Sequence, residues 1–113
     1  MGAMIFKILP RTLWEAAVAE GTFNGSPLDS VDGFIHFSTS TQMRETASKH
    51  FAGIKDLVLV AVSEDVLGDA LKWEKSRGGD LFPHLYAPLR VTLVAWARPL
   101  PIGADGQHIF PEF

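Results

Sequence analysis

The stretch DLVLVAV, residues 56–62, is an almost unbroken apolar run with the length of a β-strand. A strand that exposes one face to water alternates apolar and polar side chains, whereas a strand covered on both faces does not. This run therefore predicts a central strand buried on both faces.

Further strands are predicted on both sides of this central run. Each is a short segment rich in β-branched, aromatic or alternating apolar residues. They are residues 5–9, 34–37, 71–74 and 91–97. The segment LFPHLYAPL, residues 81–89, contains two prolines, which predict an irregular or edge segment because proline cannot donate to a strand ladder.

Two helices are predicted, the first from Thr12 to Gly21 and the second from Thr39 to Gly53. In each, the opening threonine is followed three residues later by Glu or Gln, which is the spacing of a capping box. The polar and turn-forming residues 22–30 predict a loop. Because the helices come early and most strands come late, the order predicts the α+β class rather than a regular βαβ series.

The composition limits the classes of protein to consider. A chain of 113 residues suits a single domain, residues 1–113, with residues 1–4 expected outside the fold and residues 103–113 as a tail. The absence of cysteine excludes disulfides and thiolate chemistry. Three tryptophans lie in apolar patterns and are expected in the core, namely Trp14, Trp73 and Trp96.

Charge and hydropathy predict the compartment of the protein and the classes of partner that it does not bind. A formal net charge of -3 argues against nucleic acid as a bulk electrostatic partner. No apolar run approaches the roughly 20 residues of a membrane helix, and no signal pattern opens the chain. We therefore expect a cytoplasmic protein with no membrane partner, present as a monomer or a weak homodimer.

The segment DGFIHFSTSTQ, residues 32–42, places a histidine in an apolar run ahead of four hydroxyl residues. If Ile35 and Phe37 enter the core, His36 and Ser38 lie together on the other face of the strand. The start of the second helix follows at once, and its N–H groups and dipole favour anions. These features predict a site for a phosphate, a pyrophosphate or a carboxylate. The alternative is structural, with the hydroxyl groups as helix caps and His36 as a core histidine bonded to a carbonyl.

A second group of candidate residues lies in WEKSRGGDLFPHLY, residues 73–86. The glycine pair in RGG, residues 77–79, suggests a mobile loop whose arginine grips an anion, or else an ordinary hairpin loop. His84 and Tyr86 share a face of an extended segment, where an exposed pair stacks a base or a nicotinamide ring. The alternative for Tyr86 is a half-buried surface aromatic.

Metal and serine chemistry are not predicted. His36, His84 and Glu74 are suitable metal-binding residue types, but the close spacings of zinc sites, such as H-E-x-x-H, are absent. Ser38 lacks the G-x-S-x-G context of a nucleophilic serine. We therefore expect no metal cofactor.

Five segments together resemble the family of small bacterial proteins called domain of unknown function 952. They are IFKIL…LWEAA, DGFIHFST, DLVLVAV, LKWE and FPHLYAPL, which span about residues 5–97. The resemblance implies an ADP-ribosylation-like fold, with two small, mostly antiparallel sheets around a cleft and two main helices packed outside. In the ADP-ribosyltransferase-like superfamily, the cleft binds NAD. Its sites often combine a His or Arg on an early strand, a Ser, Thr or Tyr on a second strand, and a late polar residue such as Glu.

The resemblance implies a role for individual residues. His36 with Ser38 or Thr39 matches the family's H-x-S-T element, Glu74 matches its W-E pair, and His84 with Tyr86 matches F-P-H-x-Y. The implied catalytic residues are His36, Glu74 and His84. Many members carry a histidine where this chain has Lys7. A lysine can still bind an anion there, but it does not reproduce the hydrogen bond of an imidazole. The implied ligand-binding residues are Lys7, Ser38, Thr39, Arg77, Gly78, Gly79 and Tyr86.

The resulting expectation is a pocket for a small nucleotide ligand, namely NAD, ADP-ribose or a related phosphorylated nucleotide, with ADP-ribosyl or 2'-phosphate transfer. NAD would be a substrate, and Glu74 would stabilise positive charge developing at the anomeric carbon. Two alternatives stay open. One is a non-catalytic binding module that keeps the fold, and the other is a small hydrolase that uses His36 and His84.

Overall fold

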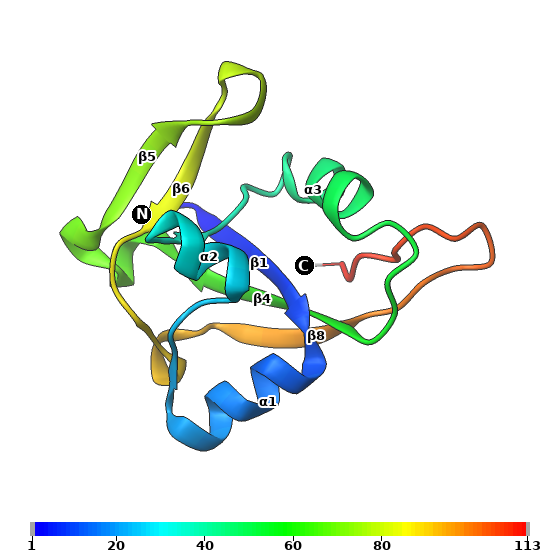
Figure 1. The fold of residues 1–113 in the computed structure, drawn as a ribbon, viewed down its shortest axis with the longest axis horizontal. Helices are drawn as coiled ribbons and strands as arrows, with labels where there is room; N and C mark the ends of the chain where they lie inside the picture. Colours follow the sequence, from blue (N-terminus) through cyan, green and yellow to red (C-terminus); the bar gives the residue numbers. More distant parts are fainter. Residues whose placement is uncertain (1, 113) are drawn as a thin grey trace.

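The structure is a computed structural model that describes residues 2–112, apart from the side chain of Arg77. Strand β4 (Leu57–Ser63) is the centre of a three-stranded antiparallel sheet, between β1 (Met4–Pro10) and β8 (Trp96–Leu100). Residues 57–62 are all buried. The predicted central strand is therefore confirmed (Figure 1).

The last strand of this sheet differs from the prediction. Residues 91–93 form a short 3₁₀ helix, and β8 begins at Trp96 and continues through Pro99. The predicted strand stopped at residue 97, before Pro99. The observed strand includes Pro99 because β8 lies at the edge of the sheet, where the N–H groups on the outer side need no partner strand.

The second three-stranded sheet has the order β3 (Ile35–His36), β6 (Leu81–Leu85) and β5 (Leu71–Lys75). Strand β6 is the middle strand, so the prediction of an irregular or edge segment is wrong. Phe37 donates its N–H to the carbonyl of Pro83 at 3.0 Å. In an antiparallel pair, the N–H opposite would normally donate back to Phe37, but proline has no N–H. This missing bond falls just after the last residue of β3, so the central strand tolerates Pro83 there.

Shorter elements complete the fold. Strand β2 (Thr22–Phe23) pairs with β7 (Leu89–Arg90) in a two-stranded antiparallel ladder. In the part of the chain that the structure describes, four 3₁₀ helices lie in the connections, at Glu64–Val66, Gly68–Ala70, Arg77–Gly79 and Val91–Leu93.

Within residues 2–112, three α-helices form where two were predicted. Helix α1 (Arg11–Glu20) ends at Gly21 as expected, but it starts before Thr12 and makes no side-chain cap, since Glu15 binds Arg11 instead. Helix α2 (Pro27–Asp32) lies in the stretch predicted to be a loop.

The second predicted helix is shorter than expected. Helix α3 (Met43–His50) begins four residues after Thr39 and ends before Gly53. Thr39 and Gln42 do exchange the reciprocal bonds of a capping box, at 3.1 and 3.3 Å, but within the turn that precedes the helix. The capping chemistry was therefore predicted correctly, while the start of the helix was misplaced by one turn.

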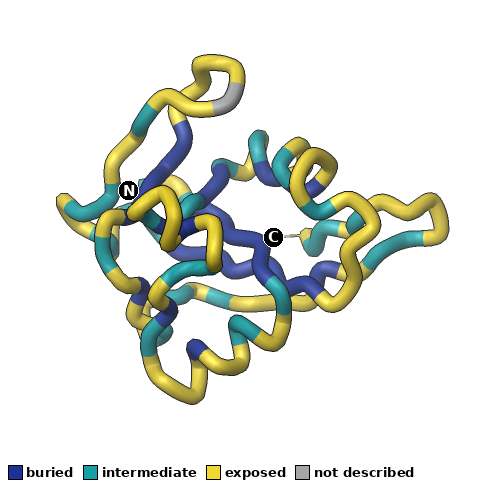
Figure 2. Tube along the Cα trace, in the orientation of Figure 1, coloured by how far each residue is buried: buried dark blue, intermediate teal, exposed yellow. Residues whose placement is uncertain are grey.

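The core has two parts, one on each face of the central sheet. Alternate residues of β4 enter each part, Val58 and Val60 on one face and Leu57 and Leu59 on the other. Helix α1 and the second sheet cover the first face, and α3 covers the second, which Figure 1 shows as helices on opposite sides. The buried stretches in Figure 2 accordingly follow β1, β4 and β6.

Both ends of the described chain pack on the fold. Residues 1–4 were expected outside it, but Met4 begins β1, and the backbone N–H groups of Gly2 and Ala3 donate to carboxylates at residues 64–65. Met1 and Phe113 lie outside the described residues. In the tail, Phe110 packs against the second part of the core. None of the described helices is long and apolar enough to cross a membrane.

Candidate functional site

The two three-stranded sheets meet where β1 approaches the end of β3. Phe6 and Ser38 form a bridge there, with both N–H···O distances at 2.8 Å. A cavity of about 430 Å³ lies at this junction, lined by residues of β1, α2, β3, α3 and β6. Its polar lining includes Lys7, Asp29, His36, Ser38 and His84.

Asp29 of α2 is the centre of the first polar cluster. Its carboxylate accepts from the backbone N–H of Ser26 at 2.8 Å and of His36 at 3.1 Å, and it pairs with Nζ of Lys7 at 3.0 Å. Lys7 also donates to the carbonyl of His36 at 3.0 Å. This cluster fixes α2 against β1 and β3.

The two buried charges of this cluster depend on each other. Burial alone would raise the pKa of Asp29, but the hydrogen bond with His36, the charge of Lys7 and the N–H of Ser26 outweigh it and hold that pKa well below its usual range. Burial lowers the pKa of Lys7, and the charge and hydrogen bond of Asp29 offset part of this effect. Asp29 is therefore ionised and balances the Lys7 ammonium.

His36 is held between two carboxylates of α2. Its Nδ1 lies 2.6 Å from Oδ1 of Asp29, and its Nε2 lies 2.8 Å from Oδ2 of Asp32. A carboxylate only accepts, so both bonds form together when both ring nitrogens carry hydrogen. A ligand that bonds the ring of His36 must therefore displace one of these partners, and Asp32 is the more exposed of the two.

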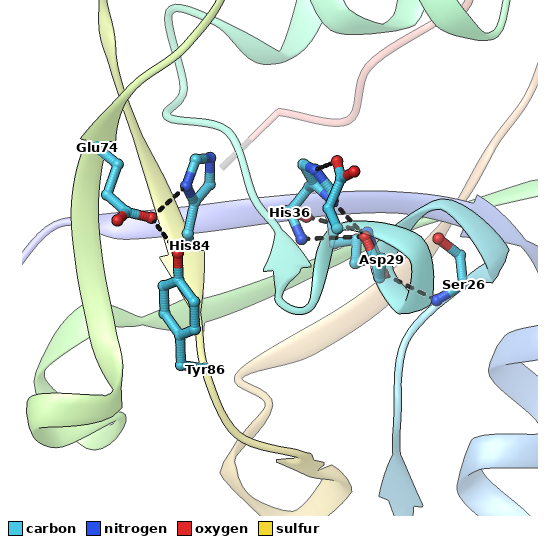
Figure 3. Close-up of polar contacts among 8 residues, drawn as sticks. Ser26, Asp29, His36, Glu74, His84 and Tyr86 are labelled. Atoms are coloured by element: carbon cyan, nitrogen blue, oxygen red, sulfur yellow. Dashed lines mark hydrogen bonds and ion pairs between the residues drawn. The ribbon is translucent and has the colours of Figure 1, made fainter.

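The second polar cluster joins β5 and β6. Nδ1 of His84 lies 2.8 Å from Oε1 of Glu74, and the hydroxyl of Tyr86 donates to the same oxygen at 2.6 Å. Hydrogen bonds with Tyr86 and then with His84 lower the pKa of Glu74, and the bond to Glu74 raises the pKa of Tyr86. Figure 3 shows this cluster beside the cluster of His36 and Asp29.

The ring of Phe34 lies between the two clusters. It stacks on His84 with centroids 4.0 Å apart, and it is tilted against His36 at 4.5 Å and Tyr86 at 5.2 Å. The centroids of His36 and His84 are 5.6 Å apart. The two histidines predicted to share a site are thus neighbours.

The structure divides the predicted site residues into three groups. Lys7, His36, Ser38 and His84 line the cavity. Glu74 and Tyr86 are outside the lining and are connected to it through His84. Thr39, Gly78 and Gly79 are also outside the lining, and the side chain of Arg77 is outside the described residues.

Two expectations about this site need correction. The predicted anion site relied on free N–H groups at residues 38–41, but two of these are used, since the N–H of Ser38 donates to the carbonyl of Phe6 and that of Thr39 to the side chain of Gln42. His84 was expected to be exposed for ring stacking, yet its side chain is only 5% exposed and is stacked on Phe34. Trp73, predicted to lie in the core, is exposed.

Sequence reasoning missed three residues of the site, namely Asp29, Asp32 and Phe34. One signal for Asp29 was available, because SPLD at residues 26–29 has the Ser-x-x-acid spacing of a helix start. Within residues 2–112, no group of three or more His, Asp or Glu side chains is arranged to hold a metal ion.

Fold and site together define a small α+β protein in which two antiparallel sheets meet at a cavity lined by histidine, lysine and carboxylate side chains. The chain belongs to the family described as "Protein of unknown function (DUF952)", whose sequence model matches residues 8–97. No curated protein matches the chain.

Solved structures of one relative support this assignment. The crystal structure of protein CC0527 from Caulobacter crescentus is 51% identical, with a TM-score of 0.91 over 95% of this chain and 94% of that chain. The solution NMR structure of CC0527 is 53% identical, with a TM-score of 0.84 over 92% of this chain and 90% of that chain.

Proposed function

We propose that the cavity binds NAD, ADP-ribose or a related phosphorylated nucleotide, and that the protein transfers an ADP-ribosyl group or a 2'-phosphate. One observation carries the proposal, namely that Lys7, His36, Ser38 and His84, which come from three separate strands or strand ends, line one cavity. Its volume of about 430 Å³ lies within the range of small-molecule pockets. In this proposal, the two sheets around the cavity are the ADP-ribosylation-like fold.

The charges around the cavity suggest how such a ligand would lie. Asp29 balances the charge of Lys7, so the buried part of the cavity has no uncompensated positive charge there and favours the uncharged ribose over the diphosphate. The hydroxyl of Ser38, bonded to Thr46 at 2.9 Å, is available for a ribose hydroxyl. The diphosphate would then lie toward Ser76, an exposed residue of the cavity lining that precedes the loop with Arg77, Gly78 and Gly79. Thr39 takes part only if the ligand extends beyond the cavity.

In ADP-ribosyl transfer, the bond between the ribose anomeric carbon and the nicotinamide nitrogen breaks, and its electron pair leaves with nicotinamide. An acceptor oxygen forms the new bond to that carbon and gives up its proton to a base. Glu74 is bonded to His84 and Tyr86 outside the cavity lining. Glu74 was expected to stabilise positive charge at the anomeric carbon directly. In this proposal it instead orients the ring of His84.

Calorimetric titration with NAD and with ADP-ribose tests the binding step. We expect folded wild type to bind at least one of them, and Ser38→Ala and His36→Ala to weaken binding about tenfold or more, as for loss of one or two polar contacts. His108→Ala is the matched control, because His108 bonds the carbonyl of Ile54 away from this cavity. Absence of binding to wild type at millimolar ligand would contradict the proposal. Binding without release of nicotinamide or transfer would favour the non-catalytic binding module.

The second candidate is a small hydrolase that uses His36 and His84. It is favoured by the pairing of His84 with Glu74 and by the presence of the Ser38 hydroxyl in the same cavity. Its test is the hydrolysis of p-nitrophenyl acetate and bis(p-nitrophenyl) phosphate. Hydrolysis that is lost in His84→Ala, together with no binding of NAD, would replace the transferase proposal with this one.

A further inference from the structure

His84 has one bonded ring nitrogen and one that has no hydrogen-bond partner among the residues that the structure describes. Its Nδ1 is 2.8 Å from the Glu74 carboxylate, which accepts only, so Nδ1 carries hydrogen. In the neutral ring, Nε2 then has a lone pair. None of the residues that the structure describes hydrogen-bonds Nε2, and Figure 3 shows this nitrogen pointing away from Glu74.

The surroundings of His84 make this unpaired nitrogen unusual. The side chain is 5% exposed, Phe34 covers a ring face, and the residue lines the cavity. Buried polar atoms are ordinarily paired, because burial without a hydrogen bond is costly. By comparison, His36 has both nitrogens bonded, and Nε2 of His108 bonds a backbone carbonyl. His50 also lines the cavity but is exposed, so among the histidines of the lining His84 is the buried one that offers an unused acceptor.

Glu74 and Tyr86 keep the ring of His84 in this state. The Tyr86 hydroxyl and Nδ1 of His84 both bond Oε1 of Glu74, at 2.6 and 2.8 Å. The two bonds stabilise the ionised form of Glu74, and an ionised Glu74 would balance positive charge on the ring. The arrangement thus fixes the position, the tautomer and the electrostatic environment of His84.

We propose that Nε2 of His84 is the proton acceptor of the cavity, and that Glu74 and Tyr86 are positioning residues that act through it. The matching ligand brings an O–H or N–H group to Nε2. The proton moves to Nε2, the electron pair stays on the donor atom, and the imidazolium charge is balanced by Glu74. If the proposed transfer reaction holds, this proton comes from the acceptor hydroxyl. The identity of the ligand rests on the proposed function, whereas the acceptor role of His84 does not.

The tautomer of His84 is measured directly by ¹⁵N NMR of the histidine rings, without any ligand. We expect His84 of the wild type to carry hydrogen on Nδ1 when the ring is neutral. Glu74→Ala should shift the population toward the Nε2–H tautomer, while Glu20→Ala, at an exposed glutamate at the end of α1, should not. Tyr86→Phe should keep the tautomer but change the His84 ring shifts. An Nε2–H tautomer in wild type, or no change in Glu74→Ala, would overturn the inference.

Chemical acylation tests whether Nε2 is reachable. Diethyl pyrocarbonate reacts with an unprotonated imidazole nitrogen, and peptide mass spectrometry locates the product. We expect His84 to react faster than His36, and Glu74→Ala to slow the reaction at His84 several-fold when the variant is assayed below its own thermal midpoint. Modification of exposed His50 without modification of His84 would contradict the inference.

These outcomes separate this inference from the proposed function. If the protein binds NAD but neutral His84 carries its hydrogen on Nε2, the proton-acceptor role of His84 is wrong and the proposed nucleotide pocket stands. If His84 is reactive and carries its hydrogen on Nδ1 but the protein does not bind NAD, the proton-acceptor role stands and the proposed nucleotide ligand is wrong.

Discussion

Asp29 is 3% exposed and binds Lys7, His36 and the backbone of Ser26 at once. Asp29→Ala leaves the Lys7 ammonium buried without its partner, so we expect the free energy of unfolding to fall by about 3–5 kcal/mol. Urea denaturation at neutral pH measures this loss. Asp69→Ala, at an exposed position, should change stability by less than about 0.5 kcal/mol.

A second variant separates the charge of Lys7 from the other contacts of Asp29. In Lys7→Met with Asp29→Leu, neither charge is buried, so we expect part of the loss to be recovered. A double variant no more stable than Asp29→Ala would show that the backbone bonds to Ser26 and His36, rather than the pair with Lys7, account for the effect.

The lowered pKa of Asp29 also predicts how stability depends on pH. Its folded pKa lies below its unfolded value of about 4, so its contribution is complete above that value and is lost as pH falls through the folded pKa. We expect the urea midpoint of wild type to fall from about pH 4 downward, and that of Asp29→Asn to fall less steeply. Equal slopes for the two proteins would contradict this account.

Among the secondary-structure elements, α2 depends on the glycine that ends it. Gly33 has φ of 86° and donates its N–H to the carbonyl of Asp29, and an added Cβ would meet nothing within 4 Å. Gly33→Ala should therefore cost only backbone strain, about 1–2 kcal/mol by urea denaturation. Gly33→Asn should cost less, because asparagine tolerates this conformation. Equal stability of wild type and Gly33→Ala would show that α2 adds little to the fold.

The elements also show what the sequence predicts well. Unbroken apolar character identified β4, and alternation placed Ile35 and Phe37 in the core with His36 and Ser38 on the other face. Helix α2 was missed because it has six residues and leaves Leu28 and Val31 exposed, so it has no apolar face to recognise. Strand β6 was misjudged because the position of Pro83 within the ladder depends on its pairing with β3, which local sequence does not reveal.

At the scale of the whole molecule, the cavity forms because two sheets meet at the bridge between Phe6 and Ser38, which are 32 residues apart in sequence. Residue types and strand alternation predicted which side chains on β3 face away from the core. Residue types and alternation could not predict that Asp29 of α2 pairs with His36 and Lys7. They also could not predict that Glu74 of β5 pairs with His84 of β6. These pairs depend on tertiary packing.

The single-domain prediction has its own test, because the two parts of the core carry different tryptophans. Trp14 packs against the first part, and Trp96 packs against the second. Leu59 is 0% exposed and belongs to the second part, so Leu59→Ala should cost about 2–5 kcal/mol. If the chain unfolds as one domain, both parts lose this stability together.

Trp73→Phe combined with Trp96→Phe leaves Trp14 as the reporter, and Trp73→Phe combined with Trp14→Phe leaves Trp96. In both backgrounds we expect Leu59→Ala to lower the free energy of unfolding by the same amount, by fluorescence and by far-UV circular dichroism. Val66→Ala, at an exposed position, is the control and should shift neither reporter by more than about 0.5 kcal/mol. A loss seen only by Trp96 would mean that the faces of the central sheet unfold separately. The bridge between Phe6 and Ser38 would then join two independently unfolding parts, and the cavity beside it would open before the chain unfolds.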